Sequence, residues 1–152
     1  MARDRVEWSA DSTWSRLVAA HVARFGPASE YGRLDVVNVL IAARADINAA
    51  DKWGATALLA ASDGRQMTSG HCDIVDALIK AKADVNVTDG GGTPIWWAAQ
   101  GGLRDVVDML IAAKADVNLA ADGGSPIWWA NYNGHRGVVD ALIAAGAPES
   151  DT

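Results

Sequence analysis

The sequence predicts an all-α solenoid in which short helix-turn-helix repeats stack side by side. The first observation is a run of Ala, Asp, an aliphatic residue and Asn that occurs at 45–48, 83–86 and 115–118, in steps of 83 − 45 = 38 and 115 − 83 = 32 residues. The second is that other positions keep these steps, namely Leu40, Leu78, Leu110 and Leu142, and Gly32, Gly70, Gly102 and Gly134. A period of about 20 to 50 residues is typical of repeat architectures.

Each unit reads as two short helices joined by turns. Thr93-Pro94 and Ser125-Pro126 indicate the start of the first helix, with a hydroxyl side chain at the N-cap and proline at the first helical position. The second helix is clearest at 105–113, where one apolar stripe is flanked by polar residues. Equivalent helices are expected at 35–43, 73–81 and 137–145. A helix pair this short cannot bury its apolar face alone, so the units must stack.

Residues 91–99, Gly-Gly-Thr-Pro-Ile-Trp-Trp-Ala-Ala, followed by Gly102 and the runs 106–107, 110–111 and 115–118, resemble the ankyrin repeat along its whole length. Residues 54–61 and 123–130 resemble the start of the same unit. The resemblance implies antiparallel helix pairs, β-hairpin-like fingers along one edge, and a concave face that binds proteins. We therefore expect one domain over 1–152, with a divergent first repeat at about 12–48 and further repeats at 49–86, 87–118 and 119–148.

Tryptophans stand where this family usually has other residues. Trp96 and Trp128 take the place of a histidine, so the resemblance implies that its hydrogen bond between repeats is lost. An aromatic cage or a sugar site is the alternative reading of paired indoles. Because Trp96, Trp97, Trp128 and Trp129 recur in register, we favour core filling instead.

Three further departures from the family pattern carry structural expectations. Arg44, Lys82 and Lys114 replace the glycine that ends the second helix, and only Gly146 conforms, so three caps should be strained. Extra residues between the helices, near 64–68 and 25–28, predict surface loops, either neutral or specific for a partner. The apolar last helix predicts an open face that 147–152, a longer repeat array or a partner would cover, while Trp8, Trp14, Leu17 and Val18 are expected to cap the other end.

Composition excludes several classes of function. Thirteen Lys and Arg against nineteen Asp and Glu give a net charge of −6, which disfavours nucleic acid as a partner. The apolar stretches are far shorter than the ~20 residues that a membrane-spanning helix needs. No targeting segment is recognisable at the start, and the single cysteine, Cys72, fits a reducing, cytoplasmic setting.

No catalytic or metal-binding motif is recognisable, so we expect neither an enzyme nor a cofactor. The three histidines, His21, His71 and His135, lack zinc-ligand spacing. The run 89–92 is better explained as a finger turn than as a phosphate loop, because it lacks the strand and lysine such loops need. Asp35, Asp73 and Asp105 are expected near helix starts, where they stabilise the helix dipole.

The predicted function is that of a protein–protein interaction module, a scaffold or adaptor that binds a partner protein through its concave face and finger loops. A permanent structural subunit of a larger assembly packed on the C-terminal repeat, or a regulatory fragment of a larger enzyme, remains the alternative. The candidate binding residues lie at finger tips and first-helix ends: Lys52, Trp53, Ala55, Ser62, Asp63, Asp89, Gly90, Gln100, Asp122, Tyr132 and Asn133. Trp53 is the strongest candidate, because tryptophan so often anchors interfaces.

Overall fold

The computed structural model describes residues 30–42, 44, 46–50, 53–63, 71–121 and 123–149. These residues form helices and turns, with one isolated β-bridge between Ala121 and Gly124. The helices are α2 (Glu30–Ala42), α3 (Ala57–Ser62), α4 (His71–Lys80), α5 (Pro94–Gln100), α6 (Arg104–Ala112), α7 (Pro126–Tyr132) and α8 (Arg136–Ala144). The expected all-α repeat fold is confirmed for this part of the chain.

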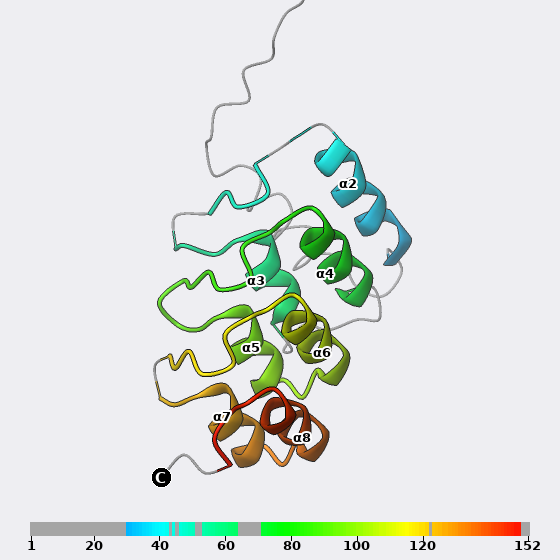
Figure 1. Cartoon of the computed structure of the whole chain (residues 1–152). Helices are drawn as coiled ribbons and strands as arrows, with labels where there is room; N and C mark the ends of the chain where they lie inside the picture. Colours follow the sequence, from blue (N-terminus) through cyan, green and yellow to red (C-terminus); the bar gives the residue numbers. More distant parts are fainter. Residues whose placement is uncertain are drawn as a thin grey trace, which may run out of the picture.

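The helices form two layers (Figure 1). One layer, called here the first-helix layer, consists of α3, α5 and α7; the second-helix layer consists of α2, α4, α6 and α8. Each helix packs on its neighbours within its layer, and α3, α5 and α7 pack on α4, α6 and α8 respectively. The connecting loops project beyond the first-helix layer. Leu78, Leu110 and Leu142, which share the repeat spacing, are each at most 1% exposed. The interior is therefore one continuous core between stacked pairs.

The first helices begin as the sequence predicts. The hydroxyl oxygens of Thr93 and Ser125 accept hydrogen bonds from the backbone N–H of Trp96 (3.3 Å) and Trp128 (3.2 Å), and a proline follows each cap. Thr56 caps α3 in the same way without a proline. These caps fix where each first helix starts relative to its finger.

The second helices match the expected segments to within two residues, except that α2 starts at Glu30 rather than Asp35. Asp73 and Asp105 lie in the first turns of α4 and α6, as expected for carboxylates that stabilise the helix dipole. Asp35 lies in the second turn of α2, so that expectation is wrong for the first repeat. The dipole interaction falls off within the first turn, and Asp35 gains little from it.

The fingers explain why the sequence repeats Ala-Asp-x-Asn. Within a finger, the Asp84 carboxylate accepts the backbone N–H of Asn86 at 2.9 Å and fixes the turn. Between fingers, Asn48 Oδ1 accepts the N–H of Asp84 at 2.7 Å and Asn86 Oδ1 accepts that of Asp116 at 2.8 Å. Pro148 stands one step further along and has no N–H to donate. The series of hydrogen bonds from asparagine Oδ1 to the next turn therefore ends, among the described residues, with the bond between Asn86 and Asp116.

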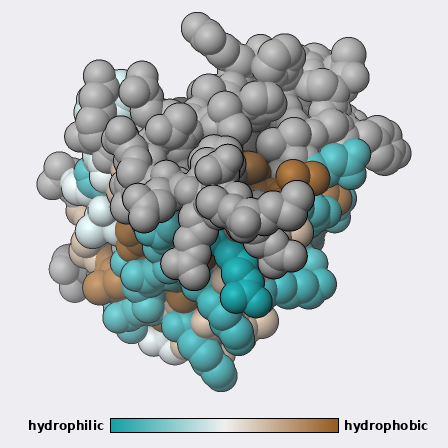
Figure 2. All heavy atoms as spheres, turned by 90° about the horizontal axis from the view of Figure 1, so that it is seen from above, coloured by the Kyte–Doolittle hydropathy of each residue, from teal (hydrophilic) through white to brown (hydrophobic). Residues whose placement is uncertain are grey.

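Figure 2 shows the molecule from above, where hydrophilic residues alternate with small groups of hydrophobic ones over the described surface. No helix among the described residues is long and apolar enough to cross a bilayer. The expected inter-helix insertions near 64–68 and 25–28, and the expected N-terminal cap at 8–18, lie outside the described residues.

The second helices end in strained backbone, as predicted. Arg44, Lys82 and Lys114 have φ values of 56°, 69° and 68°, in the left-handed region that favours glycine, whereas Gly146 occupies the equivalent place at 99°. A lysine there is partly compensated by its charge at the negative end of the helix dipole.

Replacing Lys114 by glycine is predicted to raise the free energy of unfolding by about 0.5–1 kcal/mol, because glycine adopts positive φ without a steric penalty. Urea denaturation measures the change. Lys114→Ala is the control: it removes the charge and keeps the strain, so it should not stabilise. A glycine variant no more stable than the alanine variant would contradict this explanation.

Candidate functional site

Trp96 joins two neighbouring helix pairs. It is 4% exposed, and its indole Nε1 donates a hydrogen bond of 3.0 Å to the backbone oxygen of Gly124 in the next finger. Its ring meets the edge of Trp129 at a centroid distance of 5.5 Å. The expectation that the hydrogen bond between repeats is lost is therefore wrong at this position. The indole N–H supplies the donor that the resemblance assigned to histidine.

Trp128 occupies the equivalent position in α7 but is 36% exposed, so the prediction of core filling holds for Trp96 and fails here. It stacks on Tyr132, 71% exposed, with ring centroids 5.2 Å apart and planes 8° apart. Among the described residues, no further helix pair covers Trp128 as α7 covers Trp96. The last helix, on which an open apolar face is expected, has Val138 and Leu142 buried, but Val139 is partly exposed whereas its equivalent in α6, Val107, is 0% exposed. The open apolar face therefore includes parts of both α7 and α8.

A hollow of about 490 Å³ opens across three successive first helices, called here the first-helix pocket. Its lining comes from the end of α3, from α5, from α7 and from the turn before α8. The lining residues are Asp63, Trp97, Gln100, Gly101, Trp129, Asn133 and His135. Trp97 and Trp129 are half-buried, so the prediction that they fill the core is only partly right.

The fingers hold the two indoles of the pocket in place. A Cβ added to Gly92 would lie 3.1 Å from Trp97 Nε1 and 2.6 Å from Trp96 Cε3, so glycine is needed where this finger crosses both rings. Gly123 makes a looser approach, 3.6 Å from Trp129 Cζ2. Trp129 Nε1 is buried and has no hydrogen-bond partner among the described residues.

Polar groups bridge α5 and α7 at the same place. The backbone oxygen of Gln100 accepts Asn133 Nδ2 at 2.9 Å and lies 3.1 Å from His135 Nε2. A carbonyl oxygen can only accept, so the second contact requires a proton on Nε2 of His135. These bonds fix one end of the pocket between neighbouring pairs.

The charged groups of the pocket are acidic. Among the described residues of its lining, Asp63 supplies a carboxylate and none is a Lys or Arg. The described basic residues lie on or directly after second helices, where Lys80 pairs with Asp76 at 2.6 Å and Arg104 with Asp108 at 2.8 Å.

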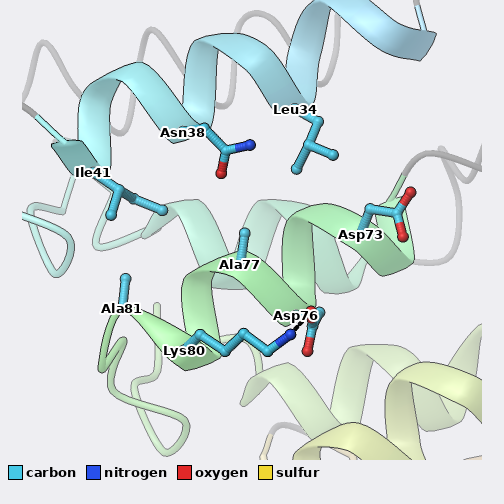
Figure 3. A pocket seen from close by; sticks show the side chains of 8 residues that line it. All are labelled: Leu34, Asn38, Ile41, Asp73, Asp76, Ala77, Lys80 and Ala81. Atoms are coloured by element: carbon cyan, nitrogen blue, oxygen red, sulfur yellow. Dashed lines mark hydrogen bonds and ion pairs between the residues drawn. The ribbon is translucent and has the colours of Figure 1, made fainter.

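A second hollow, of about 570 Å³, lies between α2 and α4 on the second-helix layer. Leu34, Asn38 and Ile41 of α2 face Ala77 of α4 and Ala81, directly after α4, across it (Figure 3). Lys80 at its rim points back to Asp76 of its own helix rather than across the gap. Asp73 also lines this hollow, which therefore combines apolar side chains with polar ones and, unlike the first-helix pocket, has no aromatic side chain among its described lining residues.

The structure places the sequence-predicted residues in several environments. The first-helix pocket contains three of them, Asp63, Gln100 and Asn133. Trp53 is exposed by 67%, and Gly90 and Tyr132 are exposed as well. Ala55 and Asp89 are half-buried. Lys52 and Asp122 lie outside the described residues.

Ser62 is the exception among these candidates, because it is 0% exposed. Its hydroxyl donates a hydrogen bond of 2.8 Å to the backbone oxygen of Leu58, one turn earlier in α3. A serine at the end of a short helix can satisfy its own hydroxyl in this way and be buried. The expectation that Ser62 contributes to an exposed surface is wrong.

Sequence reasoning missed Trp97, Trp129 and His135 as pocket residues. The sequence does contain a signal for the two tryptophans, because Trp97 directly follows Trp96 and Trp129 directly follows Trp128. One residue turns an α-helix by about 100°, so two adjacent side chains cannot both face the same neighbour.

The finger at 89–92 is a turn, as expected. Asp89 Oδ1 accepts the backbone N–H groups of Gly91 at 2.9 Å and Gly92 at 3.1 Å. A phosphate would need these amides, and they are already satisfied. Among the described residues, no group of three or more His, Cys, Asp or Glu side chains is placed to hold a metal ion.

The comparisons with known proteins agree with this geometry. A family model described as ankyrin repeats (3 copies) matches residues 26–119 and 66–151. The chain belongs to the ankyrin-repeat family. A comparison with curated proteins gives no match. Ankyrin repeats are generally protein–protein interaction modules, and their domains are typically non-catalytic.

Trp96→Phe is predicted to lower the free energy of unfolding by about 1 kcal/mol, because it removes the Nε1 donor to Gly124 and keeps a ring in the core. Trp128→Phe is the matched control at the equivalent, partly exposed position and should cost markedly less. Equal losses in urea denaturation would show that the hydrogen bond between pairs contributes nothing.

Cys72 is predicted to react slowly with alkylating agents near neutral pH. Burial raises the pKa of its thiol, and the carboxylates of Asp105 and Asp73 raise it further. The thiolate, which is the reactive form, is then scarce at neutral pH.

Asp105→Asn should lower this pKa and speed alkylation by iodoacetamide, measured as rate against pH. Asp108→Asn, which removes a carboxylate paired with Arg104, is the control and should leave the rate unchanged. An unchanged profile in Asp105→Asn would refute the electrostatic cause.

Proposed function

We propose that this chain is an adaptor without catalytic activity of its own, which binds a partner protein through its first-helix layer and fingers. The observation that carries the proposal is the first-helix pocket, where three successive units present indole, carboxylate and amide groups together. The second helices contribute mainly to the core and to paired surface charges. A half-buried single cysteine supports a reducing, intracellular setting.

Exposed aromatic side chains support the same surface. Trp53 is 67% exposed beside its finger and Tyr132 is 71% exposed on α7. Tryptophan, tyrosine and arginine are the side chains that most often dominate binding energies at interfaces. We propose that the binding surface around Trp53 and Tyr132 also includes Lys52, Ala55, Asp89, Gly90 and Asp122.

The test compares two surface variants as bait for proteins of the source cell. The first-helix variant carries Trp53→Ala and Tyr132→Ala. The matched second-helix variant carries Val39→Ala and Lys80→Ala, so each variant removes two exposed side chains. Mass spectrometry identifies what each bait captures, and calorimetry measures affinity for the purified partner.

A partner should be lost or bound at least tenfold more weakly by the first-helix variant, and it should bind the second-helix variant as it binds the wild type. Thermal unfolding of both variants should remain close to that of the wild type, since all four side chains are largely exposed. The reverse pattern of binding would refute the proposal, and a large loss of stability in the first-helix variant would show that these residues belong to the core.

A second candidate is favoured by the exposed end of α7. The face that Trp128 and Tyr132 form has the same position in its pair as the face of α5 that α7 covers. We propose as the alternative that the chain is a subunit of a larger assembly that packs a further element on this end.

If so, the purified chain should associate at rising concentration, as sedimentation velocity measures. Tyr132→Glu should suppress the association, because it places a charge on this apolar face, while Val39→Glu on α2 should not. A chain that stays monomeric throughout would count against this alternative and favour a free adaptor.

A further inference from the structure

We propose that two copies of this chain bind each other through the open end of α7 and α8, related by a two-fold axis. This inference rests on the second candidate of the proposed function, a subunit of an assembly packed on this end, and names what packs there. The open end, called here the end face, consists of one stripe on each helix: Trp128, Asn131 and Tyr132 on α7, and Arg136, Val139, Asp140 and Ile143 on α8.

The end face is built like the surface by which the preceding pair binds its neighbour. Its residues follow equivalent residues of α5 and α6 by one repeat, 136 − 104 = 32 positions. In that pair, Trp96 Nε1 donates to the backbone oxygen of Gly124 at 3.0 Å, and Arg104 Nη1 donates to that of Gly137 at 2.6 Å. The corresponding positions of the last pair therefore belong to a surface that packs on helices elsewhere in this chain.

The polar groups at these positions are unused on the end face. Trp128 is 36% exposed and Arg136 is exposed, and neither its indole Nε1 nor the guanidinium has a hydrogen-bond partner among the described residues. Arg104 pairs with Asp108 at 2.8 Å, whereas the equivalent Arg136 and Asp140 make no ion pair with each other. Both charges of α8 are thus available to another molecule.

The end face fits a second copy better than it fits a further unit of the same kind. Asn131 is exposed at the position where α5 has Ala99, which is 0% exposed. A unit stacked as α7 stacks on α5 would bury the Asn131 amide among apolar side chains, which is unfavourable unless the partner supplies hydrogen bonds. An amide has both donors and an acceptor, so Asn131 of a second copy can supply them.

The charges of the end face are complementary to themselves. In a two-fold contact, a residue that meets a second residue on the other copy is met by it in return. Arg136 and Asp140 are exposed one turn apart on α8, so packing α8 antiparallel on α8 of the second copy gives two ion pairs between them. One cation and one anion leave the end face locally neutral although the chain carries −6, which disfavours a strongly charged partner.

One axis serves both helices, which lie side by side at the end of the array (Figure 1). The midpoint between Trp128 and Tyr132 is position 130, and the midpoint between Arg136 and Asp140 is position 138. Each is four residues from Gly134 in the turn, 134 − 130 = 4 and 138 − 134 = 4, so the two midpoints lie at similar heights. An axis across both helices therefore also packs α7 on α7, with Trp128 of each copy opposite Tyr132 of the other.

Sedimentation velocity of the purified full chain at rising concentration tests the dimer. The association should saturate at two copies, because a two-fold contact is closed. Arg136→Glu and Asp140→Arg should each weaken the dimer about tenfold, since like charges then face each other in both pairs. The double variant Arg136→Glu/Asp140→Arg exchanges the charges and should restore the dimer.

Lys80→Glu is the control, because Lys80 belongs to an equally exposed pair with Asp76 on α4 and should leave the dimer unchanged. Arg136→Gln and Asp140→Asn remove the charges without reversing them and should weaken the dimer less. All these side chains are exposed, so thermal unfolding should stay close to that of the wild type. Growth beyond two copies, equal dimers in both charge-reversed variants, or a folded double variant that stays monomeric would overturn the inference.

Two results distinguish this dimer from the proposed function. If Tyr132→Glu suppresses the association but the Arg136 and Asp140 variants do not, the two-fold contact is refuted and the assembly subunit stands. If the chain stays monomeric at all concentrations, the dimer is refuted, and the capture experiment with the first-helix variant still decides the adaptor. Arg136 and Asp140 lie on the second-helix layer, so their variants leave the proposed adaptor surface intact.

Discussion

Each helix pair of this chain depends on its neighbours for a buried interior. The first helices have only six or seven residues, too few to be stable alone, and the next pair covers apolar side chains of α3 and α5. Directional bonds then fix how neighbours sit: Trp96 Nε1 on Gly124, Asn86 Oδ1 on Asp116, and Arg104 on the backbone oxygen of Gly137 at 2.6 Å. The position of every surface group follows from this stacking.

Stacking also gives adjacent residues of a first helix different environments. Trp96 turns into the contact between pairs and is 4% exposed, whereas Trp97, about 100° further round the helix, lines the pocket. Because the next unit repeats the arrangement with Trp129, one sequence feature creates both the cohesion of the array and a pair of aromatic walls. A recognition surface of this kind needs no separate domain, since it uses the side of the first helices that packing leaves open.

The sequence predicted what depends on local chemistry. The caps at Thr93 and Ser125 and the left-handed Lys82 and Lys114 follow from hydroxyl, proline and dipole effects within a few residues. Prediction from the sequence failed where the environment of a side chain depends on the neighbouring helix pair. Trp96 and Trp128 have the same local sequence, yet one donates a hydrogen bond to the next finger and the other is partly exposed. Ser62 was misplaced because its bond to Leu58 depends on helix geometry rather than on residue type.

Native-state hydrogen exchange tests the central claim, that each pair is stabilised by the pairs beside it. The backbone amides of Val106, Val107 and Leu110 in α6, which has neighbours on both sides, should exchange most slowly, and protection should fall toward α8. Slower exchange in α8 than in α6 would contradict the account, because α8 would then be stable without a second neighbour.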